Sequence, residues 1–376
     1  MRNAWLALRD RLLASDGFHR FAAWFPLTRP IARREAKALF DLVAGFVYSQ
    51  ILFACVKLDL FRILSSGPQP LSTLAVRLSL SPDAASRLLA AAQSLRLVEE
   101  RGAVNGDRMW GLGLLGGVMV SNTAVTALVE HHATLYADLR DPVALLRGEV
   151  NPALAGYWPY ANEQAQSPTL LSEERVAEYS RLMSASQPLV AGEILDAYNF
   201  AQHRCVMDVG GGQGTFLTAA ATRYPNVNFM LFDLPGVVSL ARKNFEAQGL
   251  GGRVQVHGGS FFETPLPTGA DAATVIRVLY DHDDHRALAI LKAVHTALPA
   301  GARLVVAEPM SGTPGAESMG DAYFGFYLLA MGKGRSRSAQ QLMELTAQAG
   351  FTGAELQSTR LPLQVRLIVA RKAGAS

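Results

Sequence analysis

The chain has 376 residues, of which 49% are hydrophobic and 18% are charged, and its formal net charge at pH 7 is +3. This composition excludes a chain dominated by disorder, and the length suffices for two domains with separate cores. Cys55 and Cys205 both stand in apolar runs, so we expect neither a disulfide nor a thiolate metal site. Because charges interrupt the apolar stretches, we expect no signal peptide or membrane-spanning helix, and a cytoplasmic location.

Residues 1–37 are expected to form a separate N-terminal arm. Eight basic and three acidic side chains give this arm a net charge of +5, which exceeds that of the whole chain. Its aromatic residues are Trp5, Phe18, Phe21, Trp24 and Phe25. A basic, aromatic arm can lie on an anionic membrane surface, or it can pack on a partner subunit with its arginines in water. The pattern favours the partner slightly, and both interpretations stay open.

Residues 38–150 are predicted to form a mainly helical domain with a winged helix. Large apolar residues recur at helical spacing over Phe40–Ile63, which predicts a helix buried on most of its surface, with oligomerisation as a further cover. Ser81 followed by Pro82 is typical of a helix start, and residues 101–107 predict the hairpin of the wing.

A winged helix can bind DNA, which would make the protein a regulator. Three basic and three acidic side chains in Leu71–Glu100 cancel, however, whereas phosphate neutralisation needs a basic face. We therefore expect no nucleic-acid partner. A winged-helix regulator with a degenerate cofactor domain is kept as the alternative from another functional class.

Residues 151–200 are rich in aromatic residues, Pro, Ser and Gln, and we interpret them as a helical bridge that lines a substrate pocket. The alternative is ordinary core. Strand and helix patterns alternate over residues 201–376, which predicts an α/β fold with a doubly wound, Rossmann-like sheet. The predicted strands are Cys205–Val209, Asn228–Phe232, Val254–His257, Ala272–Leu279, Arg303–Ala307 and Leu363–Ala370.

The first of these strands ends in glycines. Gly210, Gly212 and Gly214 allow positive φ and remove every Cβ from the turn, so the backbone can approach a ligand before a helix begins near Thr215. A dinucleotide fingerprint would need glycine where Thr215 stands. Asp233 ends the second strand, where an acid can accept hydrogen bonds from ribose hydroxyls. The pattern favours an adenosyl cofactor without pyrophosphate.

Reacting groups gather at the carboxyl ends of strands in open α/β sheets, so these ends should face one crevice. They are Gly210, Asp233, Ser260, Tyr280 and Glu308. The acids and histidines of Asp281–His285 look like metal ligands, but adjacent loop side chains rarely converge on one ion. Asp283 or Asp284 is well placed to cap a helix from Arg286 instead, so we expect no metal.

Five motifs appear in the order of S-adenosylmethionine-dependent O-methyltransferases of the caffeate and hydroxyindole type, which the chain resembles over most of its length. They are residues 206–214, Phe232–Pro235, Gly258–Phe262, Arg277–Asp281 and Val306–Pro309. The resemblance implies S-adenosylmethionine as cofactor, and a homodimer in which the winged-helix domain serves dimerisation and closes the substrate pocket.

The resemblance also implies roles for individual residues. The implied cofactor-binding residues are Gly210, Gly212, Gly214, Asp233, Leu234, Ser260, Phe261 and Arg277. The implied catalytic residues are Tyr280, His282 and Glu308, and the implied substrate-binding residues are Met183, Gln187, Phe324, Phe326 and Tyr327. Many relatives carry a histidine base where this chain has Tyr280, so either Tyr280 orients the acceptor or His282 replaces that base. An acid that some relatives keep is Gly334 here, which leaves Glu308 alone.

The segment Met319–Arg337 resembles the bacterial carotenoid enzymes that methylate hydroxyneurosporene and demethylspheroidene. This resemblance implies methylation of a tertiary hydroxyl in spheroidene-type carotenoid biosynthesis, and a protein that could lie peripherally at the inner, photosynthetic membrane. Apolar residues around Gly325 would then line a tunnel for one end of a polyene. A methyltransferase of a bacteriochlorophyll-type tetrapyrrole or an aromatic polyketide is the alternative.

Overall fold

The computed structural model of the chain describes residues 2–156, 187–332 and 334–374. Its contacts divide the chain into two compact units, Met1–Asn122 and Thr123–Ser376. Residues 123–150, which the sequence assigned to the winged-helix domain, therefore lie in the second unit. The helix α3 (Arg29–Lys57) also runs without a break across the predicted end of the arm at residue 37.

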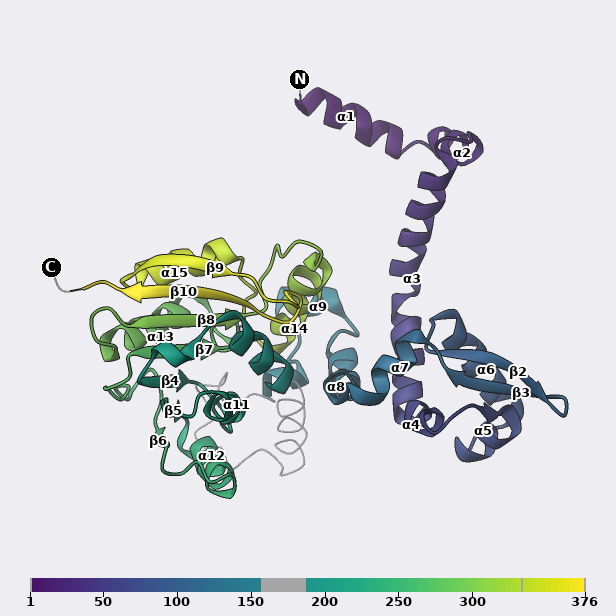
Figure 1. Cartoon of the computed structure of the whole chain (residues 1–376). Helices are drawn as coiled ribbons and strands as arrows, with labels where there is room; N and C mark the ends of the chain where they lie inside the picture. Colours follow the sequence, from purple (N-terminus) through teal and green to yellow (C-terminus); the bar gives the residue numbers. More distant parts are fainter. Residues whose placement is uncertain (1, 157–186, 333, 375–376) are drawn as a thin grey trace. The chain divides into compact units, whose positions relative to one another are not determined.

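The first unit combines helices with a small sheet (Figure 1). Besides α3, its helices are α1 (Arg2–Leu13), α2 (Asp16–Trp24), α4 (Leu60–Ser65), α5 (Leu71–Arg77), α6 (Pro82–Ser94) and α7 (Leu114–Ser121). Its strands are β1 (Gln69–Pro70), β2 (Val98–Val104) and β3 (Asp107–Leu112), in the antiparallel order β1-β3-β2.

The winged-helix prediction is confirmed in detail. The Ser81 side chain caps α6 by accepting a hydrogen bond from the backbone N–H of Ala84 at 3.2 Å, and Pro82 is the first helical residue. The wing is the β2–β3 hairpin, whose two turn residues, Asn105 and Gly106, have φ of 52° and 81°. Positive φ at both positions gives the turn a twist that matches the flanking strands.

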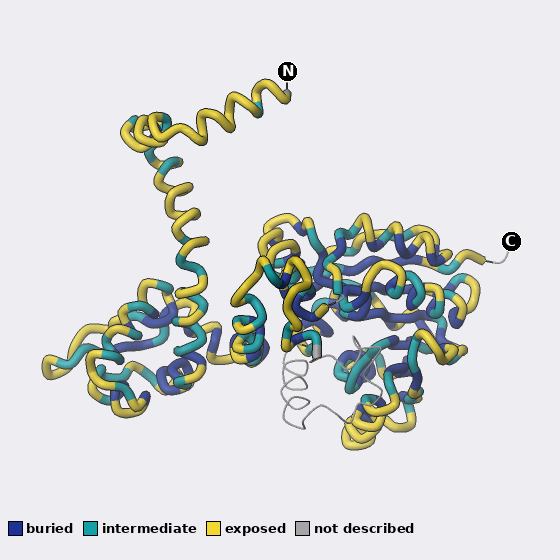
Figure 2. Tube along the Cα trace, turned by 180° about the vertical axis from the view of Figure 1, so that it is seen from behind, coloured by how far each residue is buried: buried dark blue, intermediate teal, exposed yellow. Residues whose placement is uncertain are grey.

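The segment Phe40–Ile63 is divided between α3 and α4 (Leu60–Ser65) instead of forming one helix, and α3 is not buried within its own unit, so its predicted cover by oligomerisation stays a prediction. Only 11% of its most apolar 18-residue window is buried, although the mean hydropathy of that window is 1.9. Figure 2 shows most of α3 as exposed. By length and composition this helix could cross a membrane, contrary to our expectation from the scattered charges. A signal sequence or the core helix of a soluble protein passes the same test.

The second unit contains the α/β domain. Its described helices include α8 (Thr123–Asp138), α9 (Pro142–Arg147), a segment at 187–197, α11 (Thr215–Arg223), α12 (Pro235–Ala247), α13 (Asp284–Ala297), α14 (Phe324–Met331) and α15 (Ala339–Gln348). A π-helix, η5 (Ser318–Tyr323), leads into α14, and shorter 3-10 turns are η1 (Ala153–Gly156), η3 (Phe200–Gln202) and η4 (Leu279–Asp281). The strands are β4 (Cys205–Val209), β5 (Asn228–Asp233), β6 (Val254–Gly258), β7 (Ala272–Ile276), β8 (Arg303–Glu308), β9 (Phe351–Gln357) and β10 (Arg366–Lys372).

These strands form one sheet in the order β6-β5-β4-β7-β8-β10-β9. Neighbours from β6 to β8 are parallel, and β10 is antiparallel to both β8 and β9. The doubly wound prediction is confirmed, with two errors. The predicted strand Ala272–Leu279 ends at Ile276, because Leu279 begins the turn η4, and the edge strand β9 was not predicted.

Helices cover both faces of this sheet and form two cores (Figure 1). On one face, α13 and α15 pack on side chains such as Met207 and Val306. On the other face, the 187–197 segment, α11 and α12 pack on side chains such as Val206 and Leu231. Because the central strands are buried on both faces, their ends are held rigidly, and the functional side chains stand at those ends.

Candidate active site

The glycine turn after β4 is shaped by close contacts. Gly210 has a φ of 76°, and its N–H donates a hydrogen bond to the carbonyl of Phe232 at 2.8 Å. A Cβ on this residue would lie 2.6 Å from Cγ2 of Val278 and 3.5 Å from Cζ of Phe261. A side chain would thus be strained and would clash, which explains why the turn needs glycine here. At Gly214, where φ is 82°, a Cβ would overlap the ring of Phe245.

Asp233 fixes the same turn from the end of β5. Its Oδ2 accepts a hydrogen bond from the N–H of Gly212 at 2.8 Å, and its Oδ1 accepts one from the N–H of Leu234 at 2.7 Å. Burial raises the pKa of this carboxyl, and the two backbone donors oppose that shift. Each carboxylate oxygen accepts more than one hydrogen bond, so both keep capacity for a ligand hydroxyl.

Phe261 brings the β6 end of the sheet to the glycine turn. Its ring centroid lies 6.1 Å from that of Phe232, besides its approach to Gly210. Ser260 has a local role, since its Oγ accepts a hydrogen bond from the N–H of Phe262 at 3.3 Å. Gly210, Asp233 and Phe261 therefore border one place, as the strand-end argument predicts.

Two carboxyl groups stand at the ends of β7 and β8. Oε1 of Glu308 accepts hydrogen bonds from the N–H groups of Val278 at 3.1 Å and Leu279 at 2.8 Å. Its Oε2, like Oδ1 of Asp281, is buried without a hydrogen-bond partner among the described residues. Burial raises the pKa of Glu308 to about 8, although the two backbone donors lower it. Burial, and next the charge of Glu308, raise the pKa of Asp281 well above its usual range.

Asp281 was missed by the sequence analysis, which left Glu308 alone. The signal was present, because Asp281 directly follows Tyr280 in the motif that was singled out. It was assigned to a loop of acids and histidines instead. A buried carboxyl whose pKa is raised by burial and by a neighbouring carboxyl, as that of Asp281 is, is typical of functional sites.

Arg277 supplies the positive charge of this site. Its φ of 54° places a large residue in the left-handed region, a strain that is found mainly at functional positions. Its Nη2 donates a hydrogen bond to the phenol of Tyr280 at 3.4 Å, and its charge lowers the pKa values of Glu308 and Asp281. Asp271, six residues earlier, instead accepts hydrogen bonds from backbone N–H groups at the start of β4.

Tyr280 and His282 lie in different surroundings. Tyr280 is buried edge-on to Phe324, with ring centroids 6.3 Å apart, and burial raises the pKa of its phenol. The ring of His282 lies 6.4 Å from Phe261 and 5.8 Å from Phe262, and burial lowers its pKa to about 4. Two residues apart in the chain, these side chains do not meet at one point.

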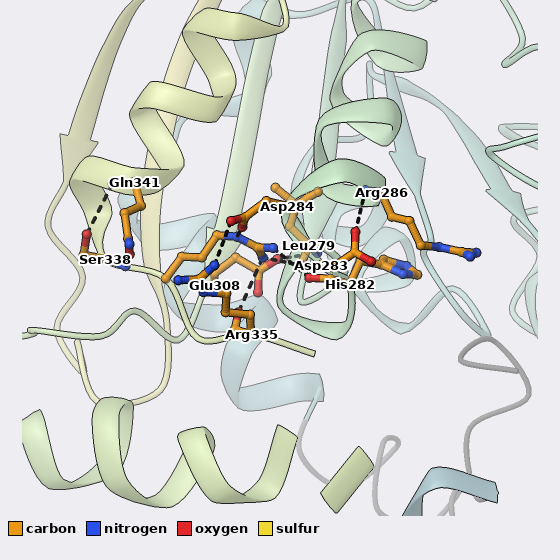
Figure 3. A network of polar contacts seen from close by, with 10 residues as sticks. Leu279, His282, Asp283, Asp284, Arg286, Glu308, Arg335, Ser338 and Gln341 are labelled. Atoms are coloured by element: carbon orange, nitrogen blue, oxygen red, sulfur yellow. Dashed lines mark hydrogen bonds and ion pairs between the residues drawn. The ribbon is translucent and has the colours of Figure 1, made fainter. Parts of the chain in front are cut away.

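The acidic loop after Asp281 is occupied by structural contacts (Figure 3). Asp283 caps α13 by accepting a hydrogen bond from the N–H of Arg286 at 2.9 Å, as one of our two alternatives predicted. Asp284 pairs with both Arg335 and Arg337 at 2.8 Å. Arg337 also donates to the carbonyls of Leu279 and His282, each at 2.7 Å. Within the described ranges, no three His, Cys, Asp or Glu side chains are arranged for a metal ion.

The residues predicted to bind substrate do not all come together. Phe324 and Tyr327 pack beside Tyr280 in one cluster. Phe326 is exposed, because a helix turns about 100° per residue and places it on nearly the opposite side of α14 from Phe324. Phe326 therefore does not lie on the same face as Phe324 and Tyr327, and its contact with the substrate stays a prediction. Gln187 is half-buried in the 187–197 segment, and Met183 lies outside the described residues.

Two histidines that the sequence analysis did not single out join this cluster. Nε2 of His131 lies 3.0 Å from the phenol oxygen of Tyr327, and Nε2 of His132 lies 2.8 Å from that of Tyr323. Both histidines belong to α8, about 190 residues before their partners. Adjacent histidines in an apolar helix were the only available signal.

Comparisons with known proteins identify the family of the chain. Residues 136–352 match the model of the O-methyltransferase domain, and residues 40–122 match that of the O-methyltransferase dimerisation domain. Demethylspheroidene O-methyltransferase of Cereibacter sphaeroides is 43% identical over 91% of this chain and 88% of its own. Acetylserotonin O-methyltransferase of Mus musculus is 30% identical over 91% of this chain and 90% of its own.

Among solved structures, human N-acetylserotonin methyltransferase matches 90% of this chain and 98% of its own with a TM-score of 0.75 at 23% identity. That likeness shows the fold, and the family models and curated relatives go further. The chain belongs to the O-methyltransferase family, with a dimerisation domain ahead of its catalytic domain.

Proposed function

We propose that the protein transfers a methyl group from S-adenosylmethionine to the tertiary hydroxyl of a hydroxylated carotenoid, in spheroidene-type carotenoid biosynthesis. The observation that carries this proposal is the 43% identity over 91% of the chain to a demethylspheroidene O-methyltransferase. A second such enzyme, from Rhodobacter capsulatus, is 39% identical over 96% of the chain. The apolar cluster of α8 and α14 beside the strand ends suits an acceptor of this kind.

The residues around the glycine turn fit the cofactor. The turn lacks the Cβ atoms that would fill it, and the buried carboxylate of Asp233 stands directly behind it. The residues that would hold S-adenosylmethionine are Gly210, Gly212, Gly214, Asp233, Leu234, Ser260, Phe261 and Arg277. When bound, this cofactor supplies the methyl group on a sulfonium. Human N-acetylserotonin methyltransferase was solved in complex with SAM.

We assign the acceptor end of the site to Tyr280 and Glu308, supported by Asp281 and Arg277. A tertiary alcohol is weakly acidic, and a buried phenol is a poor base at neutral pH, so alignment and exclusion of water carry most of the rate. His282, packed against Phe261 and Phe262, serves as a wall of the cofactor side.

The acceptor wall is formed by one face of α14. Phe324 and Tyr327 lie on that face, and Gly325 lies about 100° around the helix from Phe324, where a Cβ would meet no described atom within 4 Å. The open space beside Gly325 suits an extended apolar chain that approaches the backbone. Such a ligand needs polar partners in the protein only at the end that carries its hydroxyl.

The protein acts as a homodimer in this proposal, with the exposed side of α3 covered by a second copy. The side chains concerned are Leu39, Phe40, Leu42, Val43 and Phe46. They lie in or beside the 40–122 segment that matches the dimerisation domain. Replacing Leu42 and Phe46 together with Glu should convert a dimer into a monomer in sedimentation analysis, and a wild-type monomer would contradict the assignment.

The N-terminal arm is proposed to hold this cytoplasmic enzyme peripherally at an anionic membrane. Trp5 and Trp24 are exposed on α1 and α2, in a segment of net charge +5. Deleting residues 1–30 should abolish salt-sensitive binding to anionic liposomes and leave cofactor binding intact. Full-length protein that ignores such liposomes would instead favour packing of the arm on the partner subunit.

The direct test of the function uses labelled S-adenosylmethionine and a panel of hydroxylated carotenoids, porphyrins and phenols in detergent. We expect label in demethylspheroidene or hydroxyneurosporene and little in the other acceptors. Rapid labelling of small phenols, with both carotenoids untouched, would refute the carotenoid acceptor and leave the O-methyltransferase class standing.

A further inference from the structure

The apolar cluster of α8 and α14, called here the acceptor cluster, contains polar groups to which the proposed function has not yet given a role. Most of its members are apolar, such as Leu135, Leu154 and Met331. Among them lie the two imidazole–phenol pairs, His131 with Tyr327 and His132 with Tyr323. Burying a polar group is costly unless it is hydrogen-bonded, so these pairs need a reason to be present.

The two pairs are stacked side by side. Tyr323 and Tyr327 are one helical turn apart, and their rings are stacked with centroids 5.9 Å apart. The π-helix η5 ends at Tyr323, immediately before α14. Turns of a π-helix are rare in proteins, and those that occur are frequently at functional sites. The turn before α14 sets the orientation of these two phenols.

The two pairs differ in how the groups at the strand ends act on their phenols. Burial raises the pKa of Tyr327 well above its usual range, and Tyr280, Asp281 and Arg277 also act on it electrostatically. Burial also raises the pKa of Tyr323, but among the groups at the strand ends only Arg277 contributes to that shift. Tyr327 is also buried in the same cluster as Tyr280, whereas Tyr323 is partly buried and packs against that cluster.

We propose that the hydroxyl of Tyr327, held by His131, is the docking point for the hydroxyl group of the acceptor. This inference rests on the proposed function and identifies the residue that selects an alcohol from an otherwise apolar ligand. A phenol offers one donor and one acceptor function, and His131 uses one of them. When the phenol donates to Nε2, its oxygen accepts from the acceptor hydroxyl and leaves that oxygen's lone pairs free for the methyl group.

The state of the imidazole suits this role. Burial lowers the pKa of His131 to about 4, so the ring is neutral at pH 7 and Nε2 can accept the phenol proton. Tyr327 would touch the acceptor directly, and His131 is a positioning residue that acts through Tyr327. Tyr323 and His132 repeat the pair where the phenol is only partly buried, and they serve as an internal control.

The test compares binding of two polyenes to the full-length enzyme in detergent, followed by quenching of protein fluorescence. One polyene is demethylspheroidene, and the other has hydrogen in place of its hydroxyl. Wild type should bind the alcohol about five- to tenfold more tightly, as one neutral hydrogen bond allows. Tyr327→Phe should bring this ratio close to one, whereas the matched variant Tyr323→Phe should keep it.

Variants of the supporting histidine separate docking from mere packing. His131→Gln keeps a side chain that can bind the phenol and should retain more of the ratio than His131→Leu does. Cofactor affinity within about twofold of wild type shows that a variant is folded. A ratio that survives Tyr327→Phe overturns the proposal, as does a wild type that binds both polyenes equally.

Failure of the carotenoid function would look different. If wild type methylates a phenol and no carotenoid, the proposed acceptor is wrong, and the comparison is made with that phenol and its deoxy analogue. Loss of the ratio in Tyr327→Phe would then still support the docking point. Retention of the ratio would overturn it, whichever acceptor is used.

Discussion

The two sides of the candidate site are built in different ways. The cofactor side consists of a glycine turn, backbone N–H groups and one acid, and its parts follow successive strands of one sheet. The acceptor side consists of side chains that meet across helices far apart in the sequence, as His131 and Tyr327 do. Shared backbone geometry makes the first side general, and paired side chains make the second side specific. Changes on one side should therefore leave the function of the other intact.

The largest effect is expected from filling the acceptor side. Gly325→Trp places an indole where a Cβ meets no described atom within 4 Å, so the helix should tolerate it while the acceptor space is lost. Methylation should fall at least about 100-fold in single turnover. Cofactor affinity, measured by calorimetry, should stay within about twofold. Loss of both methylation and cofactor affinity would indicate misfolding and would contradict the independence of the cofactor side from the acceptor side.

The complementary change is made on the cofactor side. Asp233→Ala removes a carboxylate that orders the glycine turn and is proposed to bind the ribose, so cofactor binding should weaken by about 1.5–3 kcal/mol. The preference for an alcohol over its deoxy analogue should survive, because the Tyr327 pair is untouched. Unchanged cofactor affinity would exclude Asp233 from the binding site.

The cofactor side was largely predictable from the sequence because its signals are local. A buried strand, its glycines and the acid after the next strand are each readable from neighbouring residues. The His131–Tyr327 pair was not, since contacts between residues 196 positions apart leave no periodic signal. Phe326 was grouped with Phe324 and Tyr327 because a run of aromatic residues was treated as one surface, although a helix distributes the run around its axis.

Two further misses have the same kind of cause. The strand β9 alternates weakly and pairs only at the sheet edge with β10, so its sequence lacks the apolar run of a central strand. The burial of α3 depends on what covers it, and an apolar pattern predicts a partner surface without locating it. Local chemistry is thus readable from the sequence, whereas assembly between distant elements is not.

The junction of the two sides should be visible in the pH dependence of stability. Burial raises the pKa of Glu308 to about 8, so the folded state binds its proton more tightly than the unfolded state does. The resulting stability is present below about pH 4.5 and is lost as the pH rises through about 8. Glu308→Gln removes this dependence.

The measurement is the free energy of unfolding of both proteins by denaturant titration at pH 5 and pH 9. Between these values the variant should gain about 4 kcal/mol relative to wild type. Parallel curves for the two proteins would mean that Glu308 titrates normally, and that the strand-end carboxyls are not coupled by burial.

The smallest effects distinguish the role of Tyr280 from that of His282. Tyr280 is expected to act on the acceptor side and His282 on the cofactor side. Tyr280→Phe removes the hydroxyl that accepts a hydrogen bond from Arg277, beside the buried carboxyls, so the methyl-transfer step should slow about tenfold in single turnover with little change in cofactor affinity. His282→Ala removes a ring that packs on Phe261 and Phe262, so it should weaken cofactor binding about two- to threefold and leave the chemical step nearly unchanged. The reverse pattern, with His282→Ala slowing the chemical step and Tyr280→Phe silent, would make His282 the base. Because a neutral imidazole of pKa about 4 is a weak base, that outcome would also require the acceptor to reposition the ring.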